Sequence, residues 1–100
     1  MYRQEDKEMQ NYFVRYYFDS SRDRDGFMEE IKAERIGEIT LAEKGCLRYE
    51  YFFPADSDRE IFLWEQWESE ADQKCHMTQP HFGTIGKIKD KYRAQTDFEK

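Results

Sequence analysis

The chain has 100 residues and a mass of 12.3 kDa, which is enough for one domain. Its 22 acidic and 16 basic residues give a net charge of -6. This argues against nucleic acid or an anionic membrane as the main partner, because both attract basic surfaces. No apolar run approaches the roughly 20 residues of a membrane span, and the polar first segment does not resemble a signal peptide. We therefore expect a cytoplasmic protein.

Local patterns predict a tail over residues 1–10 and one domain over residues 11–100. Gly37 is placed like the residue that follows a helix, so a separate short helix or turn is expected after it. Ser69 is a good N-cap, and Pro80 suits a first helical turn. The predicted elements, in chain order, are a strand over 11–18, a helix from about Arg22, a short helix or turn over 38–44, strands over 47–53 and 60–67, a helix from Ser69 to about Met77, a helix from Pro80, and a short strand near 92–98.

The order strand, helix, strand, strand, helix, strand is the ferredoxin-like βαββαβ pattern, an α+β fold with an antiparallel sheet. Alternate residues of each strand point to opposite faces of the sheet, and in this chain both sets are apolar or aromatic. The helices suffice to cover one face only. We therefore expect the second face to be buried against another copy of the chain in a two-fold homodimer.

The ionisable groups of interest lie between Glu65 and His81. Glu65 shares a strand face with Leu63 and Trp67, so its carboxylate is either partly buried with a raised pKa or paired with a cation. One interpretation is an ion pair or a hydrogen bond to a helix terminus. The other is a base, or a partner that orients a histidine.

His76 and His81 are the only histidines. His76 falls late in the helix after Ser69, whereas His81 falls in a first helical turn, where the helix dipole disfavours imidazolium. Each is either a packing residue or a base and hydrogen-bond partner. A metal site made of both histidines and Glu65 is conceivable, but the spacing matches no strong motif, and we expect no metal.

Other chemistry is less well supported by the sequence. Cys46 and Cys75 are expected to be small buried hydrophobic residues, because nothing places a base beside either thiol. No glycine-rich phosphate loop, dinucleotide fingerprint or nucleophile elbow is present, so we expect no nucleotide cofactor.

Three blocks of sequence resemble the antibiotic biosynthesis monooxygenase domain. They are Glu43-Lys44-Gly45-Cys46-Leu47-Arg48-Tyr49-Glu50, Trp64-Glu65-Gln66-Trp67-Glu68-Ser69 and His76-Met77-Thr78-Gln79-Pro80-His81-Phe82. The resemblance covers about residues 11–93. Within the family, the chain is similar to the cofactor-free quinol monooxygenases and to the isomerase that acts on phosphorylated autoinducer-2.

The resemblance implies a dimeric α+β barrel, with a pocket between each sheet and its own helices. It makes Glu65, Trp67, His76 and His81 the candidate pocket residues. Haem-degrading relatives carry an axial histidine where this chain reads Gly83-Thr84-Ile85-Gly86-Lys87, so haem degradation is not expected. Asp72 and Gln73 stand where relatives are usually apolar.

The function expected from these observations is cofactor-independent oxidation of a small phenolic or quinol substrate by dioxygen. His76 would be the base and Glu65 its orienting partner, with Trp67 and Tyr49 as aromatic walls and His81 as a further substrate contact. One alternative is an isomerase of a small phosphorylated hydroxy-ketone, for which Arg48 or Arg35 would hold the phosphate. The other is a dimeric small-molecule binding module without turnover.

Overall fold

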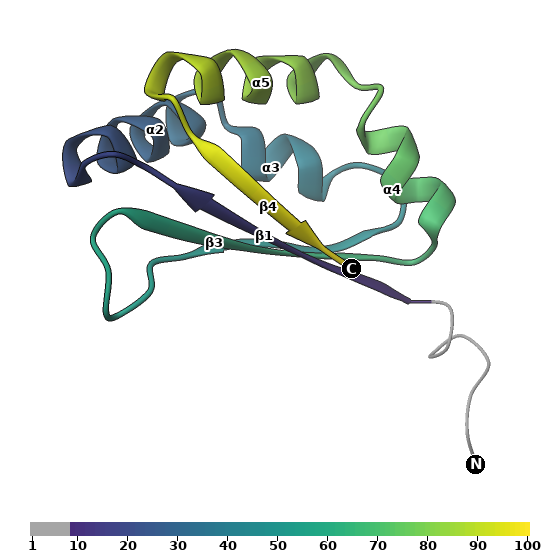
Figure 1. The fold of residues 1–100 in the computed structure, drawn as a ribbon. Helices are drawn as coiled ribbons and strands as arrows, with labels where there is room; N and C mark the ends of the chain where they lie inside the picture. Colours follow the sequence, from purple (N-terminus) through teal and green to yellow (C-terminus); the bar gives the residue numbers. More distant parts are fainter. Residues whose placement is uncertain (1–8) are drawn as a thin grey trace.

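The computed structural model describes residues 9–100, which form a four-stranded sheet with all the helices on one face (Figure 1). The elements are β1 (Gln10–Tyr17), α2 (Ser21–Ala33), α3 (Ile36–Leu41), β2 (Cys46–Phe52), β3 (Glu60–Trp67), α4 (Glu70–His76), α5 (Pro80–Tyr92) and β4 (Gln95–Glu99). The strand order is β2-β3-β1-β4 and each neighbouring pair is antiparallel, so the ferredoxin-like prediction is confirmed. The first eight residues of the predicted tail lie outside the described residues, and Gln10 already belongs to β1.

The helix starts follow from side-chain capping. The Ser20 hydroxyl accepts a hydrogen bond from the Asp23 amide at 3.1 Å, and Ser69 does the same for Asp72 at 3.1 Å. Pro80 is the first residue of α5, where its missing amide proton costs nothing. The predicted helix starts at Ser69 and Pro80 are therefore confirmed.

The break between α2 and α3 differs from the prediction. Gly37 lies inside α3, and Arg35 is the residue with left-handed backbone geometry, at φ 57°. The short helix therefore begins at Ile36 rather than at residue 38. This placement buries Ile36 and Thr40, which are 1% and 0% exposed, against the rest of the fold. Burial of the Ile36 side chain offsets the steric cost of a left-handed arginine.

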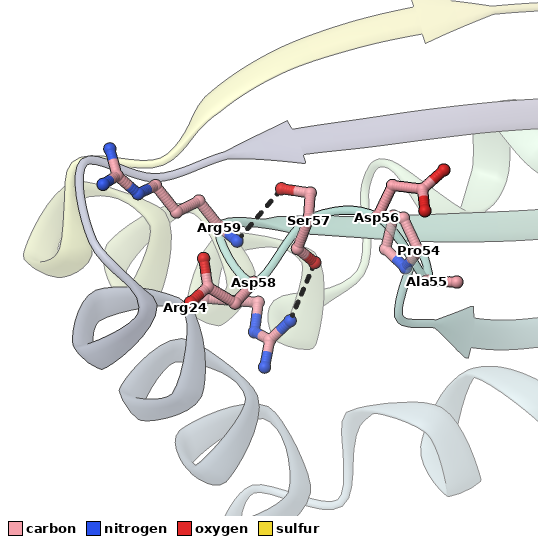
Figure 2. A pocket seen from close by; sticks show the side chains of 7 residues that line it. All are labelled: Arg24, Pro54, Ala55, Asp56, Ser57, Asp58 and Arg59. Carbon is pink, nitrogen blue, oxygen red and sulfur yellow. Dashed lines mark hydrogen bonds between the residues drawn. The ribbon is translucent and has the colours of Figure 1, made fainter.

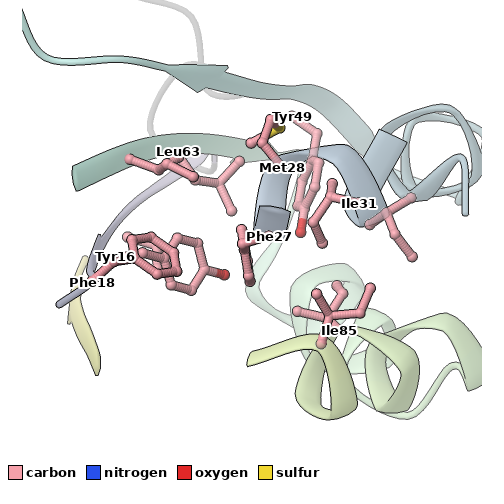
Figure 3. Packing of buried hydrophobic residues seen from close by; sticks show 12 residues of the cluster. Tyr16, Phe18, Phe27, Met28, Ile31, Tyr49, Leu63 and Ile85 are labelled. Atoms are coloured by element: carbon pink, nitrogen blue, oxygen red, sulfur yellow. The ribbon is translucent and has the colours of Figure 1, made fainter. Parts of the chain in front are cut away.

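The hydrophobic core lies between the helices and the face of the sheet that they cover (Figure 3). Phe27 of α2 lies near its centre, with its ring centroid 5.1 Å from that of Tyr16 and 5.2 Å from that of Phe18. The residues of β1 and β3 that face the helices alternate along each strand, as predicted. Those of the two strands are Tyr12, Val14, Tyr16, Ile61, Leu63, Glu65 and Trp67.

The opposite sheet face carries aromatic and arginine side chains, and none of the helices formed by residues 9–100 lies against it (Figure 1). We call this surface the open sheet face; its main residues are Phe13, Arg15, Arg48, Phe52, Phe62 and Trp64. Phe13 stacks on Phe62 with ring centroids 5.8 Å apart, and the Arg48 guanidinium lies 4.2 Å from the Trp64 ring centroid. The prediction that both faces carry aromatic residues is confirmed. In the described part of the chain, no helix is long and apolar enough to cross a membrane.

Candidate active site

A cavity of about 170 Å³ lies between the covered sheet face and the helices α4 and α5. Its walls are mainly aromatic and aliphatic, which favours a ligand with an apolar body. A few polar side chains converge on it. The polar and aromatic residues that line it include Tyr16, Tyr49, Glu65, Gln73, His76, Phe82, Lys89, Thr96 and Phe98.

His76 is the last residue of α4 and is 1% exposed. Its ring packs between other rings, with centroid distances of 5.2 Å to Trp67 and 5.3 Å to Phe82. Its Nδ1 lies 2.7 Å from Oε2 of Glu43, in the turn between α3 and β2. The imidazole is thus held in one orientation by packing on its faces and by one carboxylate at its edge.

The same oxygen of Glu43 lies 2.6 Å from Nε2 of His81 in the first turn of α5. A carboxylate can only accept hydrogen bonds, so each of these two nitrogens carries the proton. His76 is thereby fixed as the tautomer protonated at Nδ1, and its Nε2 is left as an acceptor. In the described residues no hydrogen bond is made to that Nε2, and the ring lines the cavity.

The electrostatics favour a neutral His76. Burial lowers the pKa of His76, because the charged imidazolium loses its hydration, and the positive field of His81 adds to this effect. The hydrogen bond and charge of Glu43 act in the opposite direction but do not cancel it. A neutral imidazole with a free acceptor nitrogen at a cavity wall is able to take a proton from a bound ligand.

Glu65 is the second carboxyl group of the site and is 5% exposed. It stands in register between Tyr12 of β1 and Tyr49 of β2, and its Oε1 accepts a hydrogen bond from the Trp67 indole at 3.0 Å. Burial raises the pKa of Glu65 to about 7, and the nearby charge of Glu43 adds to the rise. Near neutral pH this carboxyl group therefore exchanges between a donor and an acceptor of hydrogen bonds.

Some of the residues predicted for the site line the cavity, and others lie behind them. Tyr49, Glu65 and His76 line the cavity, as expected. Trp67 and His81 do not line it: Trp67 is 0% exposed and supports Glu65 and His76, whereas His81 lies behind His76 on Glu43. The carboxylate that orients His76 is Glu43 rather than Glu65.

Arg48 is not at the cavity, contrary to the prediction. Its guanidinium covers Trp64 on the open sheet face, because adjacent residues of a strand point to opposite sides and Tyr49 takes the covered side. Arg35 is also elsewhere, in an exposed ion pair with Glu38. The cation that does line the cavity is Lys89, which forms no ion pair with any described residue.

One cysteine differs from expectation, and both polar residues of α4 that replace the family's usual apolar ones have defined positions. Cys75 is exposed, so the prediction of a buried thiol is wrong there, whereas Cys46 is half-buried and burial raises its pKa to about 11. Asp72 is accommodated by its carboxylate accepting a hydrogen bond from the Ser69 hydroxyl at 3.0 Å. Gln73 is 5% exposed and lines the cavity.

A second hollow lies at the loop between β2 and β3, next to Arg24 of α2 (Figure 2). Arg24 donates to the Ser57 carbonyl at 3.4 Å, and its guanidinium carbon lies 4.4 Å from the Phe53 ring centroid. The hollow contains two arginines and two aspartates, and none of the residues predicted for the site. It therefore offers no acid, base or metal-ligand cluster comparable to that around His76.

Comparison with known proteins identifies relatives of the chain. A sequence model of the antibiotic biosynthesis monooxygenase family matches residues 13–87. The uncharacterized protein YjcS of Bacillus subtilis is 37% identical over 62 residues, which are 62% of this chain and 57% of that protein. The match thus spans less than two thirds of that relative's length.

Solved structures share the fold at low sequence identity. A protein of unknown function from Bacteroides thetaiotaomicron, described as a possible oxidoreductase, superposes with a TM-score of 0.81 at 21% identity, covering 92% of this chain and 94% of its own. SnoaB, a cofactor-independent oxygenase from Streptomyces nogalater, gives a TM-score of 0.71 at 11% identity, with 92% and 89% covered. These two likenesses establish the fold.

Proposed function

The chain belongs to the antibiotic biosynthesis monooxygenase family, and on that premise we propose that it is a cofactor-independent monooxygenase of a small phenolic or quinol substrate. The observation that carries the proposal is the Glu43–His76 pair. A partly buried carboxylate fixes the tautomer of an imidazole whose other nitrogen is free at a largely apolar cavity. This is the arrangement that removal of a phenolic proton requires.

The cavity size favours a single aromatic ring. An apolar protein cavity of about 150 Å³ is large enough to bind benzene. The cavity here, at about 170 Å³, suits a ring with small substituents better than a polycyclic phenol. Tyr49 and Phe82 supply aromatic walls for it.

The chemistry balances without an added reductant. A hydroquinone, C₆H₆O₂, and dioxygen give a hydroxyquinone, C₆H₄O₃, and water, so the substrate supplies all four electrons that dioxygen accepts. The phenolate form is the better reductant. The protein therefore needs to remove a proton and hold the anion in a site from which water is largely excluded.

The described residues divide these tasks. Nε2 of His76 takes the hydroxyl proton, and Glu43 stabilises the imidazolium that forms. Glu65 lines the cavity and, when protonated, would donate a hydrogen bond to the phenolate oxygen or to the reduced oxygen species. General acid–base help of this kind contributes about 10² to 10⁴ in rate.

The test is dioxygen uptake by EDTA-treated protein with a panel of substituted hydroquinones. We expect uptake above autoxidation, a loss of roughly 10²-fold or more in His76→Ala, and a smaller loss in Glu43→Gln, because the amide leaves the imidazolium unstabilised. Glu38→Gln, on the exposed side of α3, is the matched control. No uptake over the whole panel, or uptake that His76→Ala leaves intact, would overturn the proposal.

A second candidate is an isomerase of a small phosphorylated hydroxy-ketone. The observation that favours it is Lys89, a cation without an ion-pair partner among the described residues, at the same cavity as His76. Proton transfer beside a carbonyl uses the same base. Conversion of a phosphorylated dihydroxy-ketone, followed by ¹³C and ³¹P NMR and lost in Lys89→Met, would support this function. Binding of either ligand class without turnover would leave the non-catalytic binding module.

The proposed assembly is a homodimer formed through the open sheet face. Phe13, Phe62 and Trp64 form a contiguous aromatic surface there, which would be costly to leave in water. A second copy presents the same surface and is the simplest partner for it.

A further inference from the structure

The carboxylate of Glu43 and the two imidazoles form a compact group of donor atoms. Nδ1 of His76, Nε2 of His81 and a carboxylate oxygen of Glu43 lie within 4.8 Å of one another. The side chains are 1%, 11% and 13% exposed, respectively, so the surrounding structure holds all three. Two imidazoles and a carboxylate are a common ligand set for Zn²⁺, Fe²⁺ and related ions.

The distances are compatible with insertion of an ion after a small expansion. In zinc sites the metal–nitrogen and metal–oxygen bonds are about 2.0–2.2 Å long, so tetrahedral ligands lie roughly 3.3–3.5 Å apart. In the protein the nitrogen–oxygen distances are 2.7 Å for His76 and 2.6 Å for His81. Each pair must therefore open by somewhat less than 1 Å, which small side-chain rotations achieve.

The position of the group decides what a bound ion does. Glu43 and His81 do not line the cavity, whereas the ring of His76 does. An ion held by the three ligands would lie on the Nδ1 side of His76, behind the ring as seen from the cavity. It would act on a substrate only through His76.

We propose that Glu43, His76 and His81 form a binding site for a divalent transition-metal ion of the Zn²⁺ type, and that the bound ion abolishes the role of His76 as a base. The second half of this inference rests on the proposed function. The bound ion would have this effect because it changes which nitrogen of His76 carries the proton. An ion on Nδ1 displaces the proton of that nitrogen, and a neutral imidazole then carries its proton on Nε2. The nitrogen that faces the cavity changes from an acceptor to a donor.

The first measurement is binding of Zn²⁺ to EDTA-treated, dialysed protein by isothermal titration calorimetry. We expect one ion per chain. Affinity should fall by roughly 100-fold or more in Glu43→Gln and His81→Gln, because losing a ligand costs more than the 10–100-fold of losing a supporting residue. Cys75→Ser is the matched control: this exposed thiol adjoins His76 and is the obvious alternative ligand.

The second measurement reads the tautomers directly from long-range ¹H–¹⁵N NMR spectra of the histidines. Without metal we expect the proton on Nδ1 of His76 and on Nε2 of His81, as their bonds to Glu43 require. With Zn²⁺ both assignments should reverse. Binding that leaves the tautomers unchanged, or that only Cys75→Ser abolishes, would overturn the site.

The third measurement separates this inference from the proposed function. Zn²⁺ should inhibit dioxygen uptake by the wild-type protein, and the activity that remains in His81→Gln should resist it. Tautomer reversal by Zn²⁺ in a protein that shows no uptake overturns the function and keeps the metal site. Uptake by metal-free protein with no Zn²⁺ binding overturns the metal site and keeps the function. Uptake that requires the ion overturns both the metal-free mechanism and the inhibitory role.

Discussion

Replacement of Glu65 by glutamine tests the electrostatics of the site through stability. Glu65 is buried between Tyr12 and Tyr49 and accepts a hydrogen bond from Trp67. Burial raises its pKa from 4.5 to about 7. Glutamine is nearly the same shape, its amide oxygen accepts the same bond from Trp67, and it does not ionise. The variant therefore removes the charge and leaves the packing.

The direction in which the free energy of unfolding changes with pH follows from proton binding to Glu65. Between the two pKa values the folded protein holds a proton that the unfolded chain has lost, so this group's contribution to stability falls as the pH rises. A rise from 4.5 to about 7 corresponds to about 3 kcal/mol in the free energy of unfolding, fully present below pH 4.5 and lost above pH 7. About 2 kcal/mol of it falls between pH 5.5 and 8.5, a range that avoids the pI near 4.9.

The assay is urea unfolding of wild type and Glu65→Gln at fixed protein concentration over this pH range. Relative to wild type, the variant should gain about 2 kcal/mol from pH 5.5 to pH 8.5, because only wild type then buries a charge. Glu68→Gln, an exposed neighbour on the chain, is the control and should show no such gain. A difference between Glu65→Gln and wild type that stays constant with pH would refute the buried-acid interpretation.

Three further predictions concern the fold and the assembly. Gly45→Ala should destabilise the protein by at least about 1–2 kcal/mol in urea unfolding, because Gly45 has a φ of +82° and an added Cβ would meet the Asp72 carboxylate. Gly37→Ala should stabilise it by about 0.5–1 kcal/mol, because Gly37 lies inside α3 with open space beside it; destabilisation would contradict the helix start at Ile36. Phe62→Lys should shift sedimentation from dimer to monomer, whereas Leu41→Lys, an exposed apolar residue on α3, should not; a wild-type monomer would refute the dimer.

The strands and helix starts were predictable because their causes are local. Alternation of apolar side chains gave the covered face of β3, and the hydroxyl of Ser69 marked the start of α4. The end of α2 was mispredicted for the opposite reason. There the deciding factor is burial of Ile36 in the tertiary structure, which forces Arg35 rather than Gly37 into the left-handed region.

Part of the candidate site could be predicted from the sequence, and the errors in the rest of that prediction have physical causes. Strand alternation already separates Arg48 from Tyr49, so both side chains cannot reach one cavity. Glu43 was missed because it is 33 residues from His76 and 38 from His81, and only the packing of α4 and α5 on the sheet brings them together. The available signal was its position at the start of the first family-like block, Glu43–Glu50.

The two carboxyl groups explain how one small cavity holds both an acid and a base. Glu43 accepts hydrogen bonds from two imidazoles and thereby leaves His76 with an acceptor nitrogen, Nε2. Glu65 is buried, has one neutral donor and lies in the field of Glu43, so its pKa rises to about 7 and it holds a proton for part of the time near neutral pH. The charge that makes His76 a base thus also helps to make Glu65 an acid. Neutralising Glu43 disturbs both groups, and for this reason its loss cannot be read as the loss of one hydrogen bond.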